Sequence, residues 1–316
     1  MQTPEPFLGV DFWYLNADVH IDATYKNRQH NYNYQTELRE IFNKKDTPKI
    51  FVKTDLLPQY IDVLSNLNSK FILITASNDD HCVPYINYPC ENELYREKVD
   101  KFIEKEELLV WYCKNPCICH DKLIGYPLGP KWQWKTTRFF GEDKSNHLRI
   151  YNELCKSPRE KMINKDLKKN LLYFNFSQTT NRALYNPHKN IRHKVKSIIG
   201  KSFPWIESVD FETYMRVLET YKFSISPPGR GIDTHRAWES LMMGTIPIMM
   251  TTPLDHLFKN LPVIIIKDEI EWNNITPSLL DDKYNEILSK NETYNFDILY
   301  THYWKKLLSS RENAQK

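Results

Sequence analysis

The sequence predicts an α/β protein whose sheets are parallel. Short apolar runs alternate along the chain with amphipathic stretches, as strands and helices alternate in βαβ units. Several of the apolar runs are continuous, which is typical of parallel strands buried on both faces. With 316 residues the chain is also long enough to form two hydrophobic cores. These three observations favour an α/β chain of one or two domains.

The first half of the chain begins with weak periodicity and then alternates plainly. Apolar residues at a spacing of three to four predict a helix at 57–67, and the run at 71–75 suits a central strand. The expected elements are, in order, a strand at 7–14, a helix at 31–43, a strand at 49–53, a helix at 57–67, a strand at 71–75, a helix at 91–106 and strands at 108–112 and 123–128.

The second half repeats this alternation after a charged stretch at 140–169, which is expected to carry a helix and the interdomain connection. The expected elements that follow are a strand at 170–176, a helix at 191–199, a short strand near Trp205, a helix at 210–220, a strand ending near 226, a helix ending at Gly244, strands at 246–250 and 261–266, and helices at 277–289 and 294–308.

The segment 222–248 carries the strongest functional signal. A strand must stop at 227–228, where two prolines follow each other, and the glycines of 229–231 make a loop whose backbone can approach a ligand closely. Asp233 or Thr234 can cap the helix that follows. A glycine-rich loop that leads into a helix N-terminus favours an anion, because free N–H groups and the helix dipole both attract negative charge.

Positive side chains gather at the same helix N-terminus, so we interpret it as a diphosphate site. The residues expected to form it are Gly229, Arg230, Gly231, Thr234, His235 and Arg236. Glu239 lies one turn deeper on the face of His235 and can accept hydrogen bonds from ribose hydroxyls. An amphipathic helix with a solvated Arg–Glu pair is the alternative. Neither the dinucleotide fingerprint nor a P-loop is present.

Further polar side chains follow other expected strands of the second half. Asn181, Arg182 and Arg192 come after the strand at 170–176 and are additional phosphate-binding candidates, with a solvated basic loop as the alternative. The acids of 268–271 follow the strand at 261–266, where ligands of open α/β sheets gather.

The segment 226–248 resembles the donor-site motif of exostosin-like glycosyltransferases, and segments 71–84, 123–129 and 171–177 resemble other parts of that family in the same order. The likeness covers most of residues 50–305, and only 222–248 is specific. It implies the GT-B architecture, in which two Rossmann-like domains face each other across a cleft. It also implies transfer of a sugar from a nucleotide donor to a hydroxyl.

The resemblance also suggests a division of the chain. Residues 1–165 are expected to form an N-terminal acceptor-binding domain, and 166–290 a C-terminal domain that binds the nucleotide sugar. Residues 291–316 are expected to form a helix that packs back on the N-terminal domain through Trp304 and Leu308.

The catalytic base is expected in the N-terminal domain, directly after the strand at 71–75. Asp79, Asp80 and His81 crowd there, so one of them can have a pKa suited to accepting a proton. Asp80 is preferred because the family's turn keeps an acid at that place, and a helix cap is the structural alternative. A single base that activates the acceptor for direct attack predicts inversion at the anomeric carbon.

We expect neither a metal nor a cofactor. No Asp-x-Asp motif stands at a strand end, and the cationic side chains can neutralise the leaving diphosphate. The Cys113–Cys117–Cys119–His120 grouping lacks the second pair that structural zinc needs, although zinc, a disulfide and free thiols all stay open. The resemblance makes UDP the first donor to consider, with UDP-xylose among its sugars. Trp111, Trp132 and Trp134 are candidates for stacking on an acceptor glycan.

Composition excludes some classes of function. A net charge of +3 and the lack of a long basic run argue against a dedicated nucleic-acid binder. No apolar stretch is long enough for a membrane span, and the first residues do not resemble a signal peptide, so a cytoplasmic location is expected unless an anchor was removed. A non-catalytic carbohydrate- or nucleotide-binding relative and a sugar-nucleotide epimerase remain as alternatives to the transferase.

Overall fold

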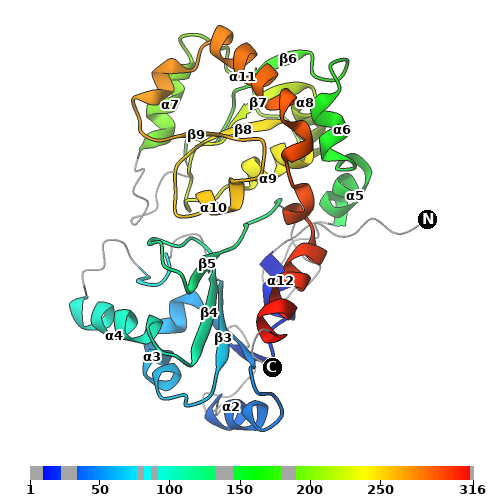
Figure 1. Cartoon of the computed structure of the whole chain (residues 1–316). Coiled ribbons are helices and arrows are strands. Elements are labelled where there is room, and N and C mark those ends of the chain that lie inside the picture. Colours follow the sequence, from blue (N-terminus) through cyan, green and yellow to red (C-terminus); the bar gives the residue numbers. More distant parts are fainter. Residues whose placement is uncertain are drawn as a thin grey trace. The chain divides into compact units, whose positions relative to one another are not determined.

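A computed structural model of the protein describes residues 10–22, 34–76, 82–86, 92–131, 145–179 and 190–313 (Figure 1). The chain divides into two compact units, one centred on Val10–Tyr126 and the other on Pro127–Ser309. We call them the N-terminal and the C-terminal unit. Each is built on one parallel sheet, which confirms the predicted α/β class. The domain limits drawn from the sequence stay a prediction.

The N-terminal unit holds a five-stranded sheet in which every strand lies beside its neighbour in sequence. All pairs are parallel, as the continuous apolar runs predicted. Its strands are β1 (Val19–Ile21), β2 (Lys49–Lys53), β3 (Phe71–Ala76), β4 (Leu108–Cys113) and β5 (Leu123–Gly125). Its helices are α1 (Val10–Leu15), α2 (Tyr34–Phe42), a 3-10 turn η1 (Thr54–Leu56), α3 (Leu57–Ser65) and α4 (Glu93–Ile103).

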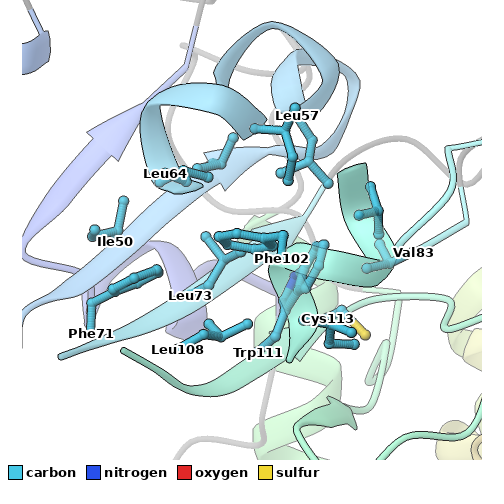
Figure 2. Close-up of a cluster of buried hydrophobic side chains, with 14 of the residues drawn as sticks. Ile50, Leu57, Leu64, Phe71, Leu73, Val83, Phe102, Leu108, Trp111 and Cys113 are labelled. Atoms are coloured by element: carbon cyan, nitrogen blue, oxygen red, sulfur yellow. The ribbon is translucent and has the colours of Figure 1, made fainter. Parts of the chain in front are cut away.

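Apolar side chains from α2, α3 and α4 form a common core with one face of this sheet (Figure 2). Leu57 and Leu64 come from α3 and Phe102 from α4, and they lie over strand residues such as Leu73. Trp111 belongs to the same core. It is fully buried, and its Nε1 donates to Thr75 Oγ1 at 2.9 Å. Its expected role in stacking on a sugar is therefore wrong.

A helix, α1, stands where the sequence suggested a first strand, so that expectation is wrong for the described part of 7–14. Trp13 of this helix is fully buried, with its ring stacked on Tyr126 at 4.3 Å and tilted against Tyr112 at 5.0 Å. Aromatic residues are enriched in strands because they pack well on half-buried surfaces. Here a helix provides the same packing for Trp13, so its aromatic character did not identify a strand.

The C-terminal unit holds a four-stranded parallel sheet in the order β6 (Asn170–Tyr173), β7 (Tyr221–Ile225), β8 (Ile246–Met250) and β9 (Ile264–Ile266). Its helices are α5 (Ser145–Leu154), α6 (Pro158–Ile163), α7 (Ile191–Ile199), α8 (Phe211–Leu218), α9 (His235–Met242), α10 (Asp255–Phe258), α11 (Pro277–Ser289) and, as far as Ser309, α12 (Thr301–Asn313), with 3-10 turns η2 (Glu271–Asn274), η3 (Asn291–Thr293) and η4 (Phe296–Leu299). The predicted helices at 191–199 and 277–289 are confirmed to the residue.

No strand forms near Trp205, contrary to the sequence prediction. The chain there is extended, and Ile206 donates its N–H to the carbonyl of Phe174 at 3.0 Å. Asn175 also donates its side-chain amide to the Ile206 carbonyl. The segment at Ile206 therefore lies against the chain that leaves the carboxyl end of β6, without forming a strand.

Gly244 ends α9 and touches α6 more closely than any other residue could. Its φ is +62°, and an added Cβ would lie 2.5 Å from the nitrogen of Met162 and 2.7 Å from the carbonyl oxygen of Pro158. Both contacts are with backbone, which cannot move aside as a flexible side chain does.

We therefore expect Gly244→Ala to destabilise the protein by about 1–3 kcal/mol, since it combines left-handed strain with overpacking. Urea denaturation followed by circular dichroism measures the change. An unfolding midpoint equal to that of the wild type would contradict the close contact between α9 and α6.

Lys168 joins the C-terminal ends of α8 and α9. Its buried ammonium donates to the carbonyls of Glu219 at 2.8 Å and Met243 at 2.9 Å, and to Thr245 Oγ1 at 3.0 Å. Desolvation lowers its pKa from 10.5 to about 7, the Glu219 carboxylate opposes this shift, and the nearby Lys161 adds to it.

The depressed pKa predicts a pH dependence of stability. Between about pH 7 and the ordinary lysine value the unfolded chain binds more protons than the folded one, so the free energy of unfolding rises with pH in that window. We expect a smaller rise in Lys168→Met than in the wild type when urea unfolding is compared at about pH 7 and pH 9. An equal rise in both proteins would show that Lys168 keeps an ordinary pKa.

Candidate functional site

The loop between β7 and α9 is buried except at its tip. Among residues 226–233 only Arg230 is exposed. Gly229 donates its N–H to the carbonyl of Gly231 at 3.0 Å, so the glycines close a tight turn that turns the Arg230 side chain outward. The loop therefore presents one cation at the carboxyl end of the sheet, as its sequence predicted.

Thr234 is the N-cap of α9, and its hydroxyl accepts from the N–H of Ala237 at 3.4 Å. The neighbouring Asp233, which was the other candidate for this cap, has a different role. Its buried carboxylate accepts from Trp238 Nε1 at 2.8 Å and from the N–H of Leu128 at 2.7 Å. Asp233 thus fixes the segment at Leu128 against the start of α9.

Arg236 lies in the first turn of α9, with its guanidinium against two neighbouring tyrosine rings. The ring centroids of Tyr173 and Tyr214 are 5.1 and 4.7 Å from its central carbon. Its Nη1 donates to the carbonyl of Asn175 at 2.6 Å. These contacts hold the cation directly beyond the carboxyl end of β6. The two tyrosines were not identified from the sequence, because nothing in their spacing relates them to Arg236.

Glu239 is buried one turn further along α9. Its Oε1 accepts from the N–H of Lys131 at 3.0 Å and from the Tyr151 hydroxyl at 3.1 Å, and its Oε2 accepts from the Tyr214 hydroxyl at 2.9 Å. Burial, together with the Glu239 charge, raises the pKa of both tyrosines well above the usual range. A ribose would have to compete with these donors. In this structure Glu239 connects α9 to α5 and α8 through the two tyrosines.

Arg192, from α7, is also buried, and its guanidinium donates to three carbonyls. Nη1 bonds Ser177 at 2.8 Å, and Nε and Nη2 bond Pro228 at 2.9 Å and Pro227 at 3.3 Å. Desolvation, with a smaller effect from the charge of Arg236, lowers its pKa to about 10. Arg192 therefore connects the chain that follows β6 with the loop that follows β7.

Residues 127–131 run along the first half of α9. Besides the bonds of Leu128 and Lys131, His235 donates from Nδ1 to the carbonyl of Gly129 at 2.8 Å. Gly129 has a φ of +72°, which favours glycine. This segment was assigned to the N-terminal domain in sequence, but it groups with the C-terminal unit.

The structure brings together most of the expected donor-site residues. Gly229, Arg230, Gly231, Thr234, His235, Arg236, Glu239 and Arg192 all lie on α9, on α7 or in the loop before α9. Asn181 and Arg182 lie outside the described residues, as do the base candidates Asp79, Asp80 and His81 and the sugar-stacking candidates Trp132 and Trp134. Their roles stay predictions.

The acids after β9 make local contacts. Asp268 accepts from the N–H of Ile270 at 2.8 Å, and Glu271 accepts from the N–H of Lys267 at 2.7 Å. Glu269 pairs with Lys194. These bonds serve the turn after β9 and give no sign of a ligand.

The described cysteines are free thiols, and their surroundings differ. Cys117 donates from Sγ to the carbonyl of Val83 at 3.1 Å, and Cys113 is fully buried. Within the part of the chain that the structure describes, no three His, Cys, Asp or Glu side chains gather as metal ligands. The helices in the same part are all too short or too polar to cross a membrane.

Comparison with known proteins adds little. No family model matches the chain, and no curated protein matches it. Among solved structures, one described as "Trehalose-6-phosphate from E. coli bound with UDP-2-fluoro glucose" is 10% identical, with a TM-score of 0.39, covering 88% of this chain and 76% of that one. A likeness at this level carries no argument about function, which must come from the geometry of the site.

The donors around Asp233 make a prediction about stability. Leu128, Thr234 and Trp238 all donate N–H groups to it, so Asp233→Asn would set an amide NH2 against one of these donors. We expect a loss of about 1–3 kcal/mol, measured by urea denaturation. Asp282→Asn, on the exposed side of α11, is the matched control and should change stability little. Equal stabilities of the two variants would contradict the stabilising role of the hydrogen bonds to Asp233.

Proposed function

We propose that the protein is a glycosyltransferase that moves a sugar from a nucleoside-diphosphate donor to a glycan hydroxyl. The observation that carries this proposal is the position of Arg236. Arg236 lies in the first turn of α9, and its guanidinium contacts two tyrosine rings and the carbonyl of Asn175, beyond the carboxyl end of β6. A cation and a helix N-terminus together at the carboxyl ends of parallel strands favour a phosphate-bearing ligand.

The charges around Arg236 support a diphosphate in particular. Besides desolvation, the charge of Arg236 lowers the pKa of Arg192, so the two guanidinium groups repel each other here. Arg230 adds a third cation at the exposed tip of the loop. Close cations in a partly buried place are stabilised when an anion lies between or beside them. A diphosphate supplies more negative charge than a single phosphate and spans a greater distance.

The reaction follows from this placement. The acceptor oxygen attacks the anomeric carbon, the bond from that carbon to the diphosphate oxygen breaks, and the acceptor proton passes to a base. The leaving diphosphate gains negative charge, which Arg236, Arg230 and the amides of the first turn of α9 would stabilise without a metal. Asp80 is the base of first choice, with Asp79 and His81 beside it in sequence. Direct attack inverts the anomeric carbon.

UDP is the first nucleotide to test, with UDP-xylose among its sugars. We expect UDP to bind in the presence of EDTA, and Arg236→Met to weaken its Kd by about tenfold or more through loss of a charge-assisted contact. Isothermal titration calorimetry measures both. Arg216→Met, on the exposed side of α8, is the control and should bind as the wild type does.

The outcomes separate the candidate functions. Binding of no nucleotide would overturn the proposal, and binding that needs Mn²⁺ would overturn its metal-free form. If UDP binds, release of UDP from a UDP-sugar that depends on an added glycan supports a transferase. Isomerisation or hydrolysis of the donor without an acceptor would indicate an epimerase, and binding without turnover a non-catalytic relative.

A further inference from the structure

The buried guanidinium of Arg192 makes more contacts with backbone than a ligand-binding arginine needs. All three of its nitrogens donate to carbonyls, one in the chain after β6 and two in the loop after β7. The side chain is 8% exposed, and its ring-facing side lies over Phe176 at 5.8 Å. Little of the guanidinium is left to meet a diphosphate, although the sequence suggested that role.

The three carbonyls identify what Arg192 holds together. Ser177 lies just beyond Asn175, whose carbonyl receives Arg236. Pro227 and Pro228 begin the loop that leads to the N-terminus of α9. These two stretches leave neighbouring strands, and no strand pairing joins them beyond Tyr173 and Ser224. Arg192 therefore fixes their separation where the sheet no longer does.

We infer that Arg192 is a positioning residue for the anion site: its planar fork holds the loop before α9 against the chain after β6, and so presents Arg236 and the first turn of α9 to one diphosphate. The inference rests on the proposed function. A positioning role differs from a direct phosphate contact in what UDP binding requires of Arg192: the planar geometry of the guanidinium matters more than its charge.

Lysine separates these two possibilities. Arg192→Lys keeps the positive charge, but a single ammonium cannot reach three carbonyls arranged around a planar fork. We expect Arg192→Lys to weaken the Kd for UDP by about tenfold or more, nearly as much as Arg192→Met does. Uridine, which has no phosphate, should bind Arg192→Lys about as well as it binds the wild type.

Calorimetry with UDP, UMP and uridine tests this. Arg216→Lys, which exchanges the same residue types on the surface of α8, is the control and should leave all three affinities unchanged. If Arg192→Lys binds UDP as the wild type does while Arg192→Met does not, charge is what matters and the inference is wrong. If uridine weakens as much as UDP, Arg192 serves the whole unit and the inference is again wrong.

A second variant covers the case in which Arg192→Lys does not fold. Pro228→Gly leaves Arg192 and its carbonyl partners in place but frees the backbone of the loop. We expect Pro228→Gly to lower the affinity for UDP and to leave the affinity for uridine unchanged. An unchanged affinity for UDP would contradict the inference. If the wild-type protein binds UDP, the affinities of the variants test the inference separately from the proposed function. If the wild-type protein binds none of the three ligands, the proposed function and the inference are both wrong.

Discussion

The C-terminal unit depends on two buried carboxylates, one just before α9 and one within it. Asp233 and Glu239 are both almost fully buried, and each is surrounded by N–H or O–H donors from other segments. A buried carboxylate without donors would cost several kcal/mol, so these partners have to stay in place for the unit to fold. The same bonds therefore orient Tyr214, whose ring supports Arg236. The hydrogen bond of Glu239 to Tyr214 thus serves two purposes: it supplies a donor to the buried acid, and it holds the ring that supports Arg236.

Arg236 and Arg192 show how charge is managed when acids are used elsewhere. The nearby carboxylate of Glu239 bonds tyrosines and an amide, and neither arginine forms an ion pair with it among the bonds described. Instead, the two guanidinium groups meet ring faces and carbonyl oxygens. Such contacts orient a cation but do not neutralise it. In the proposed site the charge of Arg236 can therefore meet a ligand, whereas the guanidinium of Arg192 is occupied by carbonyls.

The sequence predicted the fold class and most elements because their signals are local. Helix α7 and strand β3 follow from apolar spacing and from a continuous apolar run, and both lie where they were expected. The errors arose where distant parts decide. The chain at Trp205 has strand-like residues, but it makes a single backbone bond to Phe174 in place of a ladder. At Trp13, packing on Tyr126 favours a helix over the strand that aromatic content suggested.

The site could be predicted in part for the same reason. The turn at Gly229 and a cap by Asp233 or Thr234 could be predicted because both features form among neighbours in sequence, and Thr234 is the residue that caps α9. Arg192 was interpreted as a phosphate-binding candidate because it is basic and follows the strand at 170–176. Its actual partners, the carbonyls of Ser177, Pro227 and Pro228, carry no signal in a sequence, since every residue has a carbonyl. Whether an arginine meets a ligand or a backbone is decided by which loops the fold brings around it, and here two loops from neighbouring strands enclose it.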